Sequence, residues 1–260
     1  MTKQELQSAL TMPQFPRSAK YDAEWIRENQ MGPCSMWLCE FLMEKMVLKP
    51  GMRVLDMGCG KGMSSVFLAK EYGVTVFAND LWIKPSDNFK RFKEAGLEDK
   101  IIPIHAEARS LPYADDFFDA IVSIDAHNYY GTDALYLDYI SRFLKKDGQI
   151  GIIIPALTRE FDDGGVPDHL LPHWAWDMYT FHSPEWWARL WRFSQSIEVE
   201  VSDLLPDGFN VWLHWEKVQA SLKNGRNAEL ELMEADKGNY LTFGRIVGRK
   251  VTKAGGWARG

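Results

Sequence analysis

The sequence has few cysteines, no long apolar run and no excess of basic residues. Its three cysteines, Cys34, Cys39 and Cys59, are an odd number without a paired framework, which is typical of a reducing cytoplasm. No apolar stretch reaches transmembrane length, and no early run is typical of a secretion signal. The net charge of −6 argues against a general attraction to nucleic acid or anionic membranes. We therefore expect a cytoplasmic protein without nucleic-acid or membrane partners.

Metal-site spacing is also lacking. Cys34 and Cys39 have neither the tight Cys-x-x-Cys spacing nor an obvious second ligand pair, which argues against structural zinc. The histidines and aspartates between residues 162 and 182 are irregularly spaced. We therefore predict no metal.

A glycine-rich stretch at residues 52–62 is the feature around which the chain is organised. A short apolar run closes with Asp56, and glycines follow at alternate positions, Gly58, Gly60 and Gly62. Helical spacing continues over residues 63–72. A strand, a glycine turn and a helix allow the backbone to approach a nucleotide-like ligand at the helix N-terminus. The same glycines also suit a simple tight turn between packed elements.

Further apolar runs alternate with helical ones. The additional strands are expected at residues 74–80, 101–107, 117–125 and 149–154. Helices are expected at residues 89–95 and 132–144, the second capped by Thr132. Five strands alternating with helices predict a doubly wound α/β sheet, whose ligands lie at the carboxyl ends of the strands.

Asp80 ends the second expected strand, 24 residues beyond Asp56. An acid at this place in a βαβ unit reaches ribose hydroxyls, and two carboxylate oxygens suit the two hydroxyls of a ribose. The alternative interpretation is an aspartate that caps the next segment.

The two flanks differ from this core. Residues 1–20 are polar and contain Pro13 and Pro16, so we expect a loose arm, followed by helices over 21–29 and 35–47. Seven of the 11 tryptophans lie between residues 174 and 215, and the irregular stretch that begins at residue 158 indicates a lid or cap. The remaining expected elements are a helix capped by Ser183, a strand at 197–201, a helix from Trp212 to about Glu234 and a last strand at 240–247.

Four motifs occur in a familiar order: Val54–Gly62, Asp80, His105–Tyr113 and Phe118–Ser123. Together they resemble the class I, Rossmann-like S-adenosylmethionine-dependent methyltransferases, in particular their small-molecule branch, over about residues 48–155. A nicotinamide-dependent dehydrogenase is the alternative, but it usually spaces its glycines Gly-x-Gly-x-x-Gly, whereas this chain has Gly-x-Gly-x-Gly after an acid.

The resemblance implies a single domain built on a seven-stranded, mostly parallel sheet. Helices cover both faces, and the last strand is antiparallel and lies at the sheet edge. We divide the chain into an N-terminal arm and helix (1–47), a cofactor-binding core (48–157), an aromatic-rich cap (158–195) and a segment that completes the sheet (196–251).

The resemblance also implies the site residues. In that family the acid and glycines of the first motif hold the methionine portion of S-adenosylmethionine, and later motifs meet its ribose and adenine. Most relatives have aspartate where this chain has Glu107. The resemblance assigns the methionine portion to Asp56, Gly58 and Gly60, the ribose to Asp80, and the adenine to Glu107 and Ala108. The expected cofactor-binding residues also include Cys59, Leu81 and Asp125.

The sulfonium already activates the methyl group, so the protein mainly has to align a nucleophile and exclude water. A general base is needed only where the acceptor must lose a proton. His127 follows the fourth expected strand and is our candidate base, although it can equally pack or cap the next helix. Its neighbours Asp125, Asn128, Tyr129 and Tyr130 could orient the cofactor or the acceptor.

The expected reaction is methyl transfer to a small molecule by in-line displacement, in a monomer or homodimer. The tryptophan-rich cap is either core or a pocket for an apolar, planar or cationic acceptor. Lipid modification of the cyclopropane-synthase type and a non-catalytic cofactor-binding module are the alternatives.

Overall fold

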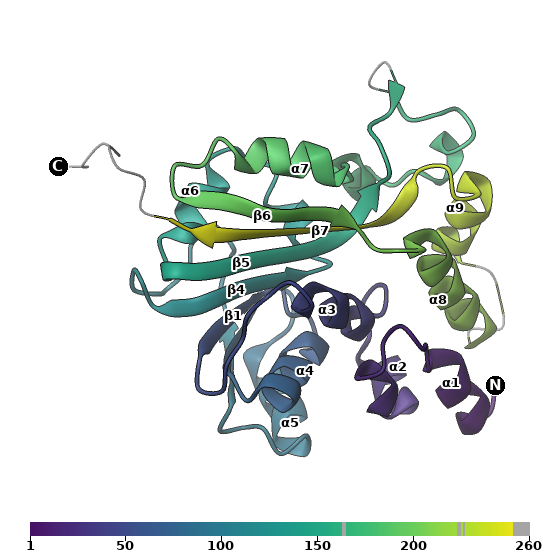
Figure 1. The fold of residues 1–260 in the computed structure, drawn as a ribbon. Helices are drawn as coiled ribbons and strands as arrows, with labels where there is room; N and C mark the ends of the chain where they lie inside the picture. Colours follow the sequence, from purple (N-terminus) through teal and green to yellow (C-terminus); the bar gives the residue numbers. More distant parts are fainter. Residues whose placement is uncertain (163–164, 223–224, 226, 252–260) are drawn as a thin grey trace.

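A seven-stranded sheet forms the centre of the computed structural model, which describes residues 1–162, 165–222, 225 and 227–251 (Figure 1). The strand order is β3-β2-β1-β4-β5-β7-β6. The strands are β1 Arg53–Met57, β2 Thr75–Asp80, β3 Ile101–His105, β4 Phe118–Ile124, β5 Leu144–Leu157, β6 Ile197–Leu204 and β7 Leu241–Lys250. The predicted doubly wound, mostly parallel sheet is confirmed.

β7 is the antiparallel strand, since it pairs antiparallel with both β5 and β6. Its direction was predicted correctly, but its predicted position at the sheet edge is wrong. The outer position belongs to β6, whose Glu198 and Glu200 are exposed. β7 is buried over its first eight residues, from Leu241 to Gly248, and therefore suits the interior of the sheet.

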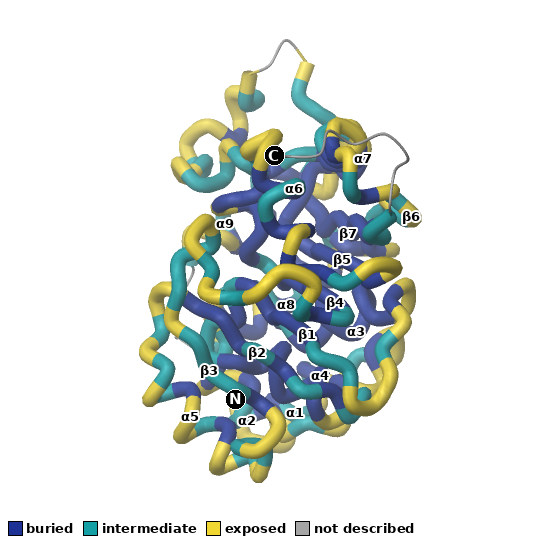
Figure 2. Tube along the Cα trace, turned by 90° about the vertical axis from the view of Figure 1, so that its left-hand side faces the viewer, coloured by how far each residue is buried: buried dark blue, intermediate teal, exposed yellow. Residues whose placement is uncertain are grey.

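Each face of the sheet carries its own hydrophobic core, because side chains alternate along a strand. Val54 and Val122 belong to a core shared with α3, α4 and α8, whereas Leu55 and Ile121 face α6 and α7. Figure 2 shows the buried strands inside a shell of more exposed segments. The helices are α1 Lys3–Leu10, α2 Ala23–Asn29, α3 Ser35–Met43, α4 Met63–Tyr72, α5 Pro85–Glu94, α6 Tyr136–Ser141, α7 Pro184–Trp191, α8 Gly208–Leu222 and α9 Ala228–Asp236, with short 3₁₀ turns η1 Ser18–Lys20, η2 His127–Tyr129, η4 Leu171–His173 and η5 Trp176–Thr180.

The N-terminal segment is ordered, so the prediction of a loose arm is wrong. Thr2 and Glu5 form a capping box that starts α1, and both prolines come after the helix has ended. Leu6 and Leu10 are buried. The buried carboxylate of Glu40 on α3 then accepts hydrogen bonds from the backbone N–H groups of Arg17 (2.9 Å) and Ser18 (2.7 Å), which fixes the chain that follows.

Two helix boundaries also differ from prediction. α6 begins at Tyr136 without a side-chain cap, so Thr132 is not its N-cap. The single helix expected from Trp212 is two helices, because the side chain of Asn227 accepts the N–H of Leu230 (2.6 Å) and starts α9 afresh. Ser183 caps α7 as predicted.

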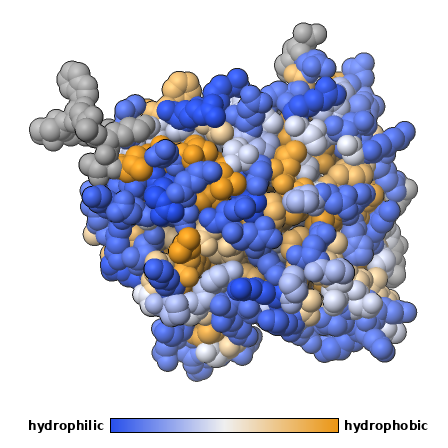
Figure 3. All heavy atoms as spheres, viewed as in Figure 1, coloured by the Kyte–Doolittle hydropathy of each residue, from blue (hydrophilic) through white to orange (hydrophobic). Residues whose placement is uncertain are grey.

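The surface is mainly hydrophilic on the face seen in Figure 3, and hydrophobic residues reach it in separate patches. Among the described residues, no helix combines the length and the apolarity needed to cross a membrane.

Candidate functional site

The glycine loop joins β1 to α4 and is held against the end of β2. The N–H groups of Gly58 and Cys59 both donate to the carbonyl of Asn79, at 2.8 and 3.1 Å. Gly58 has φ +71°, and a Cβ there would overlap the Cβ of Ala126 in the segment after β4. Glycine is therefore required both by the backbone conformation and by the close approach.

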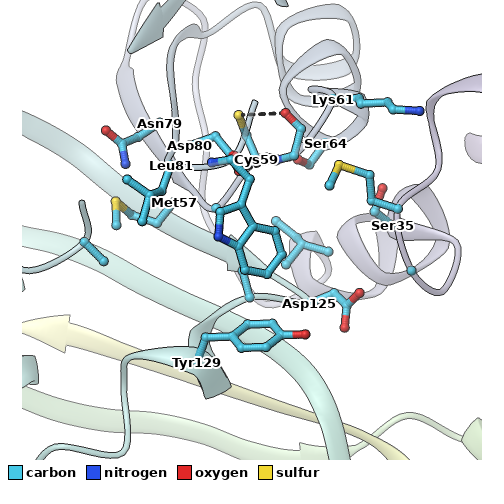
Figure 4. A pocket seen from close by; sticks show the side chains of 18 of the residues that line it. Ser35, Met57, Cys59, Lys61, Ser64, Asn79, Asp80, Leu81, Asp125 and Tyr129 are labelled. Atoms are coloured by element: carbon cyan, nitrogen blue, oxygen red, sulfur yellow. Dashed lines mark hydrogen bonds between the residues drawn. The ribbon is translucent and has the colours of Figure 1, made fainter. Parts of the chain in front are cut away.

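A cavity of about 250 Å³ opens beside this loop at the carboxyl ends of β1, β2 and β4 (Figure 4). Ligand clefts usually enclose roughly 300–1,000 Å³, so a cofactor and an acceptor together need the rim to widen. The exposed side chains of Met31 and Trp82 lie on that rim. Eight of the ten predicted site residues line the cavity: Gly58, Cys59, Gly60, Asp80, Leu81, Glu107, Ala108 and Asp125.

Asp80 connects the loops around the cavity. One carboxylate oxygen accepts the N–H of Gly60 (2.8 Å), and the other accepts those of Trp82 (2.7 Å) and Ile83 (2.8 Å). A carboxylate has about four acceptor sites, so these three donors leave capacity for a ligand hydroxyl. This geometry suits the predicted contact with a ribose.

Asp56 lies beneath the glycine loop and does not line the cavity. The hydroxyl groups of Ser64 (2.7 Å) and Ser65 (2.6 Å), in the first turn of α4, donate to one of its oxygens. Burial raises the pKa of Asp56 to about 6, and the two serine hydrogen bonds oppose that rise. Asp56 is therefore placed to order the start of α4, and the predicted direct contact with the cofactor finds no support in this geometry.

Glu107 and Ala108 reach the cavity on the loop after β3. The carboxylate of Glu107 accepts both the backbone N–H of Arg109 (2.6 Å) and its guanidinium (3.2 Å). Arg109 also donates to the carbonyl of Tyr130 (3.3 Å), which ties this loop to the segment after β4.

His127 does not line the cavity, although it follows β4 as predicted. Its ring packs against Tyr130, Tyr136 and Trp187, with centroid distances of 5.2, 5.7 and 5.5 Å. Burial lowers the pKa of His127 to about 3, so the imidazole is neutral and a weak proton acceptor. The structure therefore argues against His127 as the general base and favours the packing interpretation.

Two parts of the site were missed from the sequence. Asn29, Met31, Gly32 and Pro33 line the cavity from the N-terminal side, and Lys61 donates to the carbonyl of Glu28 (2.9 Å) beside them. A Met-Gly-Pro turn signal marks this segment, but it carries no information about a partner 30 residues away. Trp82 is the second omission, and it directly follows the predicted Asp80 and Leu81.

The tryptophans of the cap do not line the cavity. Trp187 and Trp191 are 0% and 1% exposed and belong to the core on the α6–α7 face. The cap instead approaches the site through η5, where Asp177 accepts a hydrogen bond from the hydroxyl of Tyr129 (3.2 Å). Within the described residues, no group of three or more histidine, cysteine or acidic side chains is arranged to hold a metal ion.

Residues 55–152 match a family model described as a methyltransferase domain. Residues 55–152 thus carry a methyltransferase domain. The predicted resemblance is thereby confirmed, and the seven-stranded sheet agrees with it.

Alignments with two similar proteins are longer than this domain match. Methyltransferase GfsG of Streptomyces halstedii is 31% identical over 127 residues, which are 48% of this chain and 46% of that protein. A glycine/sarcosine/dimethylglycine N-methyltransferase of Actinopolyspora halophila is 30% identical over 190 residues, 70% of this chain and 32% of its own length. This chain thus spans less than half of either relative.

A solved structure supports the fold over almost the whole chain. Geranyl diphosphate C-methyltransferase from Streptomyces coelicolor A3(2), in complex with Mg²⁺, geranyl diphosphate and S-adenosyl-L-homocysteine, superposes with a TM-score of 0.68. The match covers 94% of this chain and 87% of that one at 18% identity.

Proposed function

We propose that this methyltransferase transfers the methyl group of S-adenosylmethionine to a small-molecule acceptor by in-line displacement. The observation that carries the proposal is the meeting of the glycine loop, Asp80 and Glu107 around one cavity within a methyltransferase domain. Asp80 retains acceptor capacity for a ribose hydroxyl, and the glycine loop lines the same cavity. Glu107 and Ala108 would meet the adenine.

The cofactor supplies an activated methyl group when bound, so the protein's contribution is alignment and exclusion of water. Holding two reactants in line can contribute roughly 7–11 kcal/mol in favourable cases. The glycine loop would fix the donor side, and the segment after β4 the acceptor side. Met31 and Trp82, whose exposed side chains line the cavity, would cover the reacting groups.

We also propose that the outer part of the acceptor contacts the cap at η5, where Trp176 and Tyr179 are 81% and 62% exposed. The contact between Tyr129 and Asp177 brings this turn to the cavity rim. We propose further that the protein acts in the cytoplasm as a monomer or homodimer. Its three cysteines are unpaired and buried, which supports a reducing compartment.

Calorimetric titration with S-adenosylmethionine and S-adenosylhomocysteine tests the donor half of the proposal. Binding of neither compound would contradict it. A screen of metabolite extracts with labelled methyl donor then tests transfer. Labelled methylene-bridged lipid would instead indicate cyclopropane-type chemistry, and binding without turnover across a broad panel would indicate a non-catalytic module.

We expect His127→Leu to retain turnover. The Nε2 atom of His127 has no hydrogen-bond partner among the described residues, so an apolar side chain of similar size suits the site. The rate constant for methyl transfer should stay within about threefold of the wild-type value, whereas loss of a general base would cost roughly 100- to 10,000-fold. Single-turnover assays with labelled donor measure this, and thermal unfolding of the variant checks its fold.

A further inference from the structure

Asp125 occupies a fixed position at the cavity, directly after β4. Its backbone adopts φ +54°, and its N–H donates to the carbonyl of Ile153 on β5 (2.8 Å). Gly32 packs so closely against it that a Cβ at Gly32 would overlap the Asp125 carboxylate. The carboxylate is thus held between the sheet and the N-terminal segment that borders the cavity.

Two aromatic rings line the cavity together with this carboxylate. Trp82 is 69% exposed and Tyr129 is 41% exposed, and their ring centroids lie 5.6 Å apart with an interplanar angle of 69°. Figure 4 shows Asp125 and Tyr129 on the opposite side of the cavity from Asp80 and Asn79. Asp125 and Tyr129 therefore lie away from Asp80, which is assigned to the ribose. Trp82 follows Asp80 closely in the chain, and its ring extends from that side of the cavity to Tyr129.

The surroundings of Asp125 are acidic. Burial first, and then the carboxylates of Glu216 on α8 and Asp177 on η5, raise the pKa of Asp125 to about 8. The two basic side chains that line the cavity have other partners: Lys61 donates to a carbonyl at its edge, and Arg109 pairs with Glu107. A positively charged group beside Asp125 would favour its ionised form, whereas an anionic group would oppose ionisation.

We propose that Trp82, Tyr129 and Asp125 form the acceptor subsite for a protonated amine, so that nitrogen is the methylated atom. This inference rests on the proposed methyl transfer and adds its substrate class. Aromatic faces attract an ammonium through their quadrupole, and a carboxylate beside them supplies both a counter-charge and a proton acceptor.

The reaction balances with these groups alone. The ammonium gives one proton to the Asp125 carboxylate, which leaves a neutral amine with a free electron pair on nitrogen. That pair forms the new N–CH₃ bond while the S–CH₃ bond breaks, and sulfur keeps the bonding pair as a neutral thioether. Asp125 then returns its proton to solvent. The raised pKa of Asp125 suits this role. Because its carboxylate is more basic than an ordinary one, it accepts a proton from an ammonium at a lower cost in free energy.

A matched pair of probes tests the subsite without requiring the natural acceptor. Choline and the uncharged isostere in which carbon replaces its nitrogen are titrated into the protein saturated with S-adenosylhomocysteine. We expect choline to bind about tenfold or more tightly than the isostere. Asp125→Asn and Trp82→Leu should each reduce that preference by at least about threefold, whereas Phe193→Leu, which replaces an exposed ring outside the cavity, should not.

The outcomes separate this inference from the proposed function. Failure of S-adenosylhomocysteine to bind the wild type would remove the proposed function itself. Equal affinity for the two probes, or binding of neither, would overturn the amine subsite alone. If Asp125→Asn weakened S-adenosylhomocysteine binding as strongly as choline binding, Asp125 would belong to the cofactor side and the inference would fail. In turnover, a labelled-methyl panel should favour small amines over the corresponding alcohols.

Discussion

Replacing Asp80 by alanine is expected to weaken binding of S-adenosylhomocysteine by about 100-fold or more, which is roughly 2.7 kcal/mol. The variant loses the predicted ribose contact and leaves the N–H groups of Gly60, Trp82 and Ile83 without their acceptor. A hydrogen bond to a charged group contributes about 1.5–3 kcal/mol. Loss of the ribose contact, together with disorder of the loop, is therefore enough to explain a loss of affinity of about 100-fold. Isothermal titration calorimetry measures the affinity.

Asp99→Ala is the matched control, because it removes the same charge from an exposed position outside the cavity. It should leave the affinity unchanged. If Asp80→Ala also bound S-adenosylhomocysteine as the wild type does, Asp80 would have no ribose role.

Gly58→Ala should impair both folding and binding. A side chain at φ +71° is strained, and its Cβ would overlap that of Ala126, which has no flexible end to move away. Strain of about 1–2 kcal/mol and overpacking of about 1–3 kcal/mol together predict a loss of roughly 2–5 kcal/mol in the free energy of unfolding. Displacement of the glycine loop should also weaken S-adenosylhomocysteine binding at least about tenfold.

Gly96→Ala separates the two causes. Gly96 has φ +67°, but a Cβ there meets nothing within 4 Å, so only the backbone strain applies. We expect a loss of about 1 kcal/mol, measured by chemical denaturation, with unchanged affinity. Equal losses for the two variants would show that contact with Ala126 is unimportant.

The sequence predicts the donor side of this protein better than its acceptor side. The reason is the distance along the sequence between the residues that meet at each side. The loop from Asp56 to Gly62 and the acid at Asp80 belong to one βαβ unit, so strand, turn and helix signals place them together. The contact between Gly32 and Asp125 joins two distant segments, and no local pattern reports it. From the sequence, Asp125 could orient either the cofactor or the acceptor, and the choice between the two depends on neighbours that only the fold supplies.

The aromatic residues show a second limit of local reasoning. Trp187 and Trp82 have the same side chain, yet one is 0% exposed in the core and the other is 69% exposed at the cavity. His127 likewise has the chemistry of a base and the right place in the chain, but its ring faces Tyr136 and Trp187. The direction in which a side chain leaves a short turn depends on tertiary packing, which composition and spacing do not contain.

The place of β7 has a consequence for how the chain acquires its structure during synthesis. β6 is made before β7 but joins the sheet only through it, so the order of pairing cannot follow the order of translation. Until residues 241–250 leave the ribosome, the outer edge of β5 from Gln149 to Leu157 has no partner. An unpaired apolar edge is prone to association with other chains. The nascent protein therefore depends on β7 to pair with the free edge of β5 before another polypeptide pairs with it.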